Sequence, residues 1–273
     1  MIIPPDLPRV IERIALRLIT GRPLFSVKAA RDPVEPGQRS KSRAEDNLAD
    51  VLQTHFDAQR ETIRDALSGE RSNLSIADIT RRIREHSEQA ASETANVFVD
   101  SIADGLNLFA ESAQIGVDYA LVNMGATEWA RQYSFELIKG IDAVSAEATG
   151  QAIAAFVQTP GMTIGDVMKQ LEPIFGAGRT ANIAATEITR VYAQANQLAG
   201  ERLKQDFPGV KVIKRWFTNN DDRVCPICAP LNNKVVEISE KFEGGDGKKY
   251  DNPPDPHVGC RCWTTTTTRI ARP

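Results

Sequence analysis

The sequence is poor in cysteine, in aromatic residues and in long apolar runs. All four cysteines lie between Cys225 and Cys262, so the first 224 residues contain none. Aromatic residues make up only 6% of the 273 residues, although hydrophobic residues make up 41%. Ala and Leu therefore supply much of the apolar surface. This composition favours helices, because both residues have high helix propensities and small side chains let helices approach closely.

No apolar run approaches the roughly 20 residues that a helix needs to cross a bilayer. The first residues, MIIPPDLPRV, also lack the basic and then apolar order of a secretion signal. Both absences predict a soluble protein made in the cytoplasm. In that compartment a local cluster of cysteines indicates a metal site first, because a disulfide framework would be spread through a small secreted fold.

The net charge of −3 is unevenly distributed along the chain. Residues 1–43 carry nine Lys and Arg against four Asp and Glu, residues 44–210 carry thirteen against twenty-four, and residues 211–273 carry eleven against eight. Basic ends on an acidic middle suit contact with an acidic protein surface or with nucleic acid. Neither end has the dense Lys/Arg block of a dedicated nucleic-acid arm, so ordinary solvated faces are the preferred interpretation.

The first two predicted segments are residues 1–40 and residues 41–159. The first is a short helix followed by an extended arm, because several prolines interrupt residues 22–40. A plain linker is preferred there over an arm that drapes over a neighbouring subunit. The second is a helical body with apolar residues at helical spacing from about Ser42 to Gly69. His55 lies beside this apolar stripe and is expected to be a packed side chain, not a ligand or base.

The helical body continues after a predicted cap, and glycines mark its expected breaks. Ser75 and Asp78 form a capping-box-like pair at the start of a helix. Helical character then extends to Pro160, with breaks expected near three glycines, Gly105, Gly116 and Gly125.

Residues 160–208 are predicted to be two helices. Thr163 and Asp166 cap the first, whose apolar residues continue to Phe175. Gly176 and Gly178 predict a turn, after which the second helix continues up to Pro208. Glu187 interrupts the apolar face of this helix. It is expected to face solvent or to pair with Arg190 one turn away, since no partner acid or nucleophile for catalysis is identifiable beside it.

Residues 209–273 change to a β-rich pattern. Three strands are predicted in VKVIKRWFTN, VVEI and WTTTTTRI, and residues 243–256 are predicted to be loop. About 60 residues with three short strands bury too little surface to be stable alone. The module therefore needs a cross-link, such as a bound metal or a disulfide. The predicted fold class is therefore mainly α, with an elongated multi-helix body followed by a small β-rich C-terminal module clamped by Cys and His.

The candidate clamp has five donors, which occur as C-x2-C and H-x2-C-x-C: Cys225, Cys228, His257, Cys260 and Cys262. A C-x2-C turn presents two thiolates to one tetrahedral ion. We favour the first four as ligands, with Cys262 as the substitute, because residues two apart in an extended strand point to opposite faces. Structural zinc is the preferred cofactor. A disulfide joining Cys225 or Cys228 to Cys260 or Cys262 is the alternative, and four or more donors leave no open position for catalysis.

These residues resemble the C-terminal signature of the phage Mu F-like head morphogenesis family, the minor capsid proteins of tailed phages. The resemblance rests on the aspartate-rich turn into C-P-x-C, on P-P-x-P-H-x-x-C-R-C and on the threonine-rich strand that follows. The preceding helix carries a similar motif in Arg179, Thr186, Glu187, Arg190 and Asn196, whereas Ala185 stands where members often have an arginine. The resemblance covers roughly residues 160–268.

The resemblance implies a structural protein of a phage or prophage head and no enzyme. It would bind the portal protein, the major capsid protein or both during head assembly in the host cytoplasm, would be a component of the virion, and would contact no membrane in the assembled state. A part in DNA packaging or delivery is left open. The alternative is a DNA-binding zinc module that acts on the packaged or ejected genome. Its candidate contacts are Lys214, Arg215, Lys248, Lys249 and Arg261, with Trp216 and Trp263 available to stack on bases.

Overall fold

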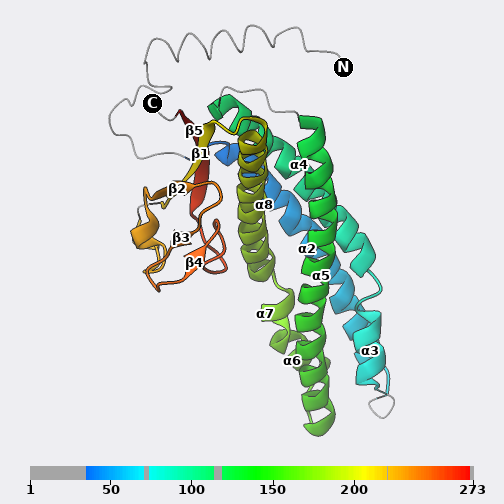
Figure 1. The fold of residues 1–273 in the computed structure, drawn as a ribbon. Helices are drawn as coiled ribbons and strands as arrows, with labels where there is room; N and C mark the ends of the chain where they lie inside the picture. The colour runs from blue at the N-terminus through cyan, green and yellow to red at the C-terminus, as the bar shows by residue number, and fades with distance from the viewer. Residues whose placement is uncertain (1–34, 71–73, 114–118, 220, 271–273) are drawn as a thin grey trace.

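The protein is an elongated bundle of long helices with a small β module packed against two of them (Figure 1). This computed structural model describes residues 35–70, 74–113, 119–219 and 221–270. The predicted N-terminal helix and most of the predicted arm lie outside these residues. The predicted fold class, a mainly helical body followed by a small β-rich module that contains a Cys/His cluster, is confirmed.

Within the described residues, four long helices form the body, and three short helices lie between them. The long helices are α2 (Gln38–Leu67), α4 (Ser87–Ala113), α5 (Tyr119–Gln158) and α8 (Ala177–Asp206), and the short ones are α3 (Ile76–Arg82), α6 (Ile164–Gln170) and α7 (Glu172–Phe175). Helix α8 packs against α2 and α4, while α4 also packs along α5. None of the helices in the described part of the chain combines the length and the apolar character that a membrane span requires.

The predicted helix caps are present. The Ser75 side chain accepts a hydrogen bond from the Asp78 N–H, and Thr163 and Asp166 form a reciprocal capping box. The single helix predicted after Thr163 is instead two helices, α6 and α7, separated at Leu171. Pro173 explains the break, because it has no N–H to continue α6 and is favoured in the first turn of a new helix.

The predicted glycine breaks are wrong wherever the structure describes them. Gly105 lies inside α4 and Gly125 inside α5, while Gly116 lies outside the described residues. A Cβ on Gly105 would lie 2.8 Å from Cβ of Ala195, so this glycine lets α4 and α8 cross closely. Gly37, with a φ of 70°, precedes α2, and residues 38–40 of the predicted arm are therefore helical.

The C-terminal module contains a three-stranded antiparallel sheet and a short hairpin. The sheet has the order β2-β1-β5, built from β1 (Val210–Phe217), β2 (Val235–Glu237) and β5 (Trp263–Ile270). These are the three predicted strands. The hairpin of β3 (Phe242–Glu243) and β4 (Lys249–Tyr250) lies in the segment predicted to be loop. Its turn is stabilised by Asp246, which accepts hydrogen bonds from the Lys248 N–H and the Tyr250 hydroxyl.

Two separate hydrophobic cores hold the molecule together. The larger core joins all four long helices and takes in Val212 and Ile238 from the module. The smaller core lies inside the module, and three of its six buried members are cysteines: Trp216, Cys228, Leu231, Phe242, Cys260 and Cys262. A core of so few apolar side chains is small, which fits the expectation that this module needs a stabilising cross-link.

A candidate metal centre in the C-terminal module

All five predicted ligands meet at one place in the module. Cys225 and Cys228 lie in the turn after β1, and the backbone N–H of Cys228 donates to the sulfur of Cys225 at 3.3 Å. His257, Cys260 and Cys262 lie in the loop between β4 and β5. A hollow of about 20 Å³ is lined by all five residues. About 10–15 Å³ suffices for a water-sized occupant, so the hollow has room for one ion.

Two of the three distances between ligand atoms match those around a tetrahedral ion, and the third, between His257 and Cys225, is shorter. Nε2 of His257 lies 3.1 Å from Sγ of Cys225 and 3.6 Å from Sγ of Cys228, and the sulfurs of Cys228 and Cys260 are 3.8 Å apart. Ligand atoms around a tetrahedral zinc ion, with bonds of about 2.0–2.3 Å, are separated by about 3.5–3.8 Å. All four cysteines are free thiols, and 3.8 Å is far longer than a disulfide bond of about 2.05 Å. The residues present therefore fit a metal ion better than a disulfide.

The five donor atoms divide into two overlapping groups, each within 4.8 Å. One contains Cys225, Cys228 and His257, and the other contains Cys228, Cys260 and Cys262. The predicted quartet is thus not one closed group, since Cys260 is grouped with Cys262 and not with His257. The prediction that the side chains of Cys260 and Cys262 point to opposite faces of a strand is wrong. Strand β5 begins only at Trp263, and both sulfurs face Cys228.

His257 presents the nitrogen that a metal requires. Its Nδ1 lies 3.0 Å from the backbone carbonyl oxygen of Val258, which can only accept a hydrogen bond. In the neutral ring Nδ1 therefore carries the hydrogen, and the lone pair of Nε2 faces the sulfurs of Cys225 and Cys228. Burial opposes protonation, but the Val258 carbonyl and the nearby thiolates of Cys260 and Cys225 outweigh it and raise the pKa of His257.

The thiols control one another's ionisation. Hydrogen bonds from Cys228 and Cys262 lower the pKa of Cys260. Hydrogen bonds with Cys260 and Cys262, together with burial, raise the pKa of Cys228. Several thiols this close together disfavour one another's ionisation. A divalent cation bound between them would supply positive charge and favour the thiolate form.

The helix motif lies in two different places. Thr186 and Arg190 contact the loop that carries His257: the Thr186 hydroxyl accepts a hydrogen bond from the Gly259 N–H at 2.8 Å, and Arg190 pairs with Asp255. Arg179 lies in the helical body, where it donates to the Ile174 carbonyl at 2.7 Å and stacks over the Phe56 ring.

Tyr133 of α5 was missed by the sequence analysis. Its hydroxyl donates to Glu187 at 2.6 Å, and Glu187 also forms the expected ion pair with Arg190 at 3.1 Å. Nothing in the sequence links Tyr133 and Glu187, which are 54 residues apart.

Several predicted nucleic-acid contacts are buried, which corrects the sequence analysis. Lys214 is only 1% exposed, because its Nζ donates to the Asp251 carbonyl at 2.8 Å. Trp216 and Trp263, which were proposed to stack on bases, are 0% and 7% exposed. Lys248 and Lys249 are exposed, Arg215 is half-buried, and Arg261 is half-buried and paired with Asp221 at 2.7 Å.

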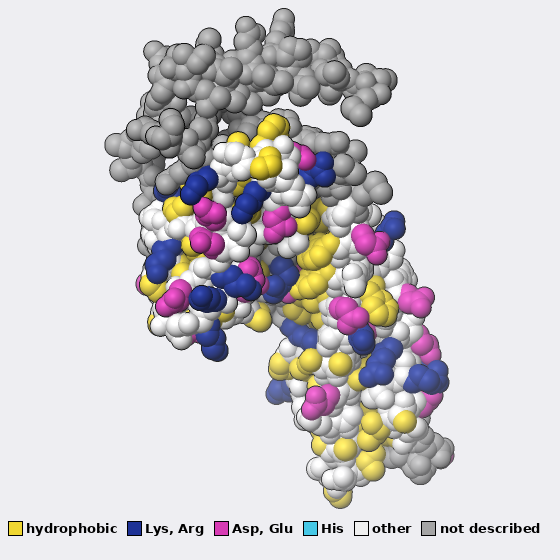
Figure 2. Space-filling view, viewed as in Figure 1, with side chains coloured by type: hydrophobic (Ala, Val, Ile, Leu, Met, Phe, Trp, Pro, Cys, Tyr) yellow, Lys and Arg dark blue, Asp and Glu magenta, His cyan; other side chains and the backbone are white. Residues whose placement is uncertain are grey.

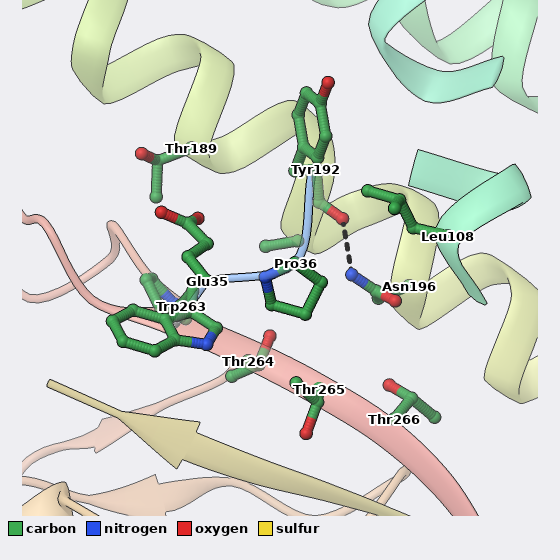
Figure 3. A pocket seen from close by; sticks show the side chains of 12 residues that line it. Glu35, Pro36, Leu108, Thr189, Tyr192, Asn196, Trp263, Thr264, Thr265 and Thr266 are labelled. Carbon is green, nitrogen blue, oxygen red and sulfur yellow. Dashed lines mark hydrogen bonds between the residues drawn. The ribbon is translucent and has the colours of Figure 1, made fainter. Parts of the chain in front are cut away.

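A second pocket lies where the described chain begins (Figure 3). Its walls come from the Glu35–Pro36 start, from α4 and α8, and from Trp263 to Thr266 of β5. Its volume is about 60 Å³, which is room for only a few waters at roughly 10–15 Å³ each. It is therefore too small for a cofactor.

One protein family matches the part of the chain that contains the five clustered ligands. Residues 149–265 match the family model described as Phage Mu protein F like protein. This segment is a Mu F-like segment. It contains the helix motif and all five clustered ligands, so the resemblance seen in the sequence is confirmed, with slightly earlier boundaries. This is a family of structural phage proteins, and it is associated with head morphogenesis. No curated protein and no solved structure matches the chain.

Proposed function

We propose that this chain is a head morphogenesis protein of a tailed phage or prophage, which binds the portal protein, the inner capsid or both during head assembly and is a component of the virion. The observation that carries the proposal is the Mu F-like match over residues 149–265, which spans both α8 and the clustered Cys and His. In this role the helical body contacts the partner, and the module adds a rigid β surface beside α8.

The surface of the body supports a partner contact. Helix α5 exposes large apolar side chains, with Phe135 54%, Val144 49% and Val157 50% exposed. A groove of about 420 Å³ also runs between α5, α8 and the loop at residues 251–255, with Trp129 and Tyr133 in its wall. Figure 2 shows apolar side chains gathered in a strip along the middle of this face, beside the charged surface of the module. Exposed apolar and aromatic side chains of this kind are typical of protein interfaces.

We further propose that the cluster holds one structural zinc ion. Cys225, Cys228 and His257 would supply three ligands, and Cys260 or Cys262 the fourth. Zinc accepts such sulfur and nitrogen ligands, and the ion would supply folding energy to a module with a small core. Elemental analysis of the purified full chain should find one zinc per chain. A disulfide in place of metal would instead lower the count of free thiols from four to two.

A retention assay tests the assembly role. The full chain is immobilised and offered the portal protein and the major capsid protein encoded in the same genome. We expect one of them to be retained. Phe135→Glu should reduce retention at least tenfold if α5 is the contact, whereas Glu136→Gln, at the exposed neighbouring position, should leave it unchanged. If the unaltered chain retains neither the portal protein nor the major capsid protein, the proposal is contradicted.

The DNA-binding alternative keeps some support, because Lys248 and Lys249 are exposed and residues 211–273 carry eleven basic against eight acidic residues. Retention of nonspecific duplex DNA, with an affinity that falls steeply with salt, would favour this alternative. DNA retention in the absence of portal or capsid retention would replace the assembly role.

A further inference from the structure

The loop between β4 and β5 carries three of the five candidate metal ligands, and two polar contacts join its residues 255–260 to α8. We call residues 255–260 the hook. At one end of the hook, the Gly259 N–H donates to the Thr186 hydroxyl at 2.8 Å. Gly259 lies between His257 and Cys260, and its φ of 74° disfavours any other residue. The position of this strained turn therefore depends on a side chain of α8.

At the other end of the hook, Arg190 bridges α8 and the module. Its Nη1 lies 3.0 Å from a carboxylate oxygen of Asp255, and its Nε lies 3.1 Å from Glu187. Although burial lowers the pKa of Arg190, the carboxylates of Glu187 and Asp255 and the Tyr133 hydroxyl outweigh it and raise the pKa. The guanidinium therefore stays charged between its two partners.

Two further residues fix the direction of Arg190. Glu187 is 8% exposed and accepts the hydrogen bond from the Tyr133 hydroxyl at 2.6 Å. Burial and the Glu187 charge both raise the pKa of Tyr133, so its hydroxyl keeps its proton and remains a donor. The Arg190 guanidinium also lies over the Tyr133 ring, 5.8 Å from its centre.

Asp255 transmits this anchor to the ligand. Its second carboxylate oxygen accepts from the Asn252 N–H at 3.1 Å, and the His257 N–H donates to the Pro254 carbonyl at 3.1 Å. These bonds shape the turn that ends at His257. A displacement of Asp255 would therefore move His257 relative to Cys225 and Cys228.

We propose that Thr186 and Arg190 are positioning residues for the metal ligands, and that Glu187 and Tyr133 hold Arg190 in place. The inference rests on the proposed metal site. Metal binding and the docking of the hook on α8 then favour each other, because coupling between two binding events is reciprocal. Groups that orient metal ligands from behind change metal affinity by about 10–100-fold when removed.

The test compares two arginines of the same helix in the full chain. Arg190 and Arg202 have nearly equal side-chain exposures of 31% and 32%, and each pairs with a carboxylate on α8, but only Arg190 reaches the module. Zinc affinity is measured by competition with a chromophoric chelator. Arg190→Ala should bind zinc about 10–100-fold more weakly than the unaltered chain, and Arg202→Ala should bind it equally well.

Thr186 provides a second pair of variants. Thr186→Val removes the hydroxyl that accepts from Gly259 and should weaken zinc binding, whereas Thr186→Ser retains the hydroxyl and should not. Amide hydrogen exchange of residues 252–260 is followed in the same samples. It should rise in Arg190→Ala and Thr186→Val, while the helical circular dichroism of the body stays unchanged.

The outcomes separate this inference from the metal proposal. Normal zinc affinity and normal exchange in both Arg190→Ala and Thr186→Val would overturn the inference, as would equal weakening in Arg202→Ala. If the unaltered chain binds no zinc, the metal proposal fails. The exchange of residues 252–260 would then still show whether α8 positions the hook.

Discussion

At the scale of single residues, Asp142 holds together the buried polar network of the helical body. It is 2% exposed and accepts hydrogen bonds from His55 and Gln59, both at 2.7 Å, and from Ser87. Asp142→Ala would leave the buried His55 ring without its carboxylate partner and would remove one acceptor each from Gln59 and Ser87. We expect a loss of about 3–5 kcal/mol in the free energy of unfolding, measured with urea.

The control for this prediction is Asp57, whose side chain is 59% exposed on α2. Asp57→Ala should change stability by no more than about 0.5 kcal/mol. A loss below about 1 kcal/mol in Asp142→Ala would show that the network relaxes or takes up water.

Residue types in the candidate site could be predicted, but their distant partners could not. The spacings C-x2-C and H-x2-C-x-C were enough to recognise all five ligands, because short spacings fix the local geometry of each half of the cluster. Arg190 was found as a partner of Glu187 for the same reason, since it is one helical turn away. Tyr133 and Asp142 act across 54 and 87 residues, and a single sequence contains no information on which helices pack together.

At the scale of elements, glycines in α4 and α5 have opposite roles. A Cβ on Gly105 would meet Cβ of Ala195 at 2.8 Å, whereas a Cβ on Gly140 would meet nothing within 4 Å. We expect Gly105→Ala to destabilise the chain by about 1–3 kcal/mol through overpacking between α4 and α8. Gly140→Ala should stabilise it by up to about 1 kcal/mol, because Ala favours the helix.

Thermal unfolding of the two glycine variants checks this prediction. Equal shifts in the same direction would mean that α4 and α8 can move apart at little cost. The same contact explains why helix breaks were wrongly predicted at glycines. Helix propensity is a local quantity, and the packing of α8 on α4 outweighs it at Gly105. Caps at Ser75 and Thr163 were predicted correctly because their hydrogen bonds are local.

At the scale of the whole molecule, the two cores should respond differently to loss of metal. The core of the helical body contains none of the cysteines, whereas the module core contains Cys228, Cys260 and Cys262. Adding a strong chelator to the full chain should loosen the surroundings of Trp216, seen as a shift in its fluorescence. The helical circular dichroism should remain, because α2, α4, α5 and α8 pack without the module's ligands.

Heating the chelated chain should therefore give two unfolding transitions where the metal-bound chain gives one. An unchanged Trp216 signal would mean that the module is stable without metal. Joint loss of helix and module signals would mean that the body depends on the module for its stability.

The larger core also determines where this protein can be divided. Ile188, Val191 and Ala195 of α8 are buried in the same core as Leu48 and Phe98, which precede the Mu F-like segment. A fragment that begins at residue 149 would keep α8 and lose α2 and α4, so its apolar stripe would be open to water. The match to the family model thus begins at residue 149, which is not a boundary of a folding unit. Relatives that share only this segment must cover α8 with helices, or with neighbouring subunits, of their own.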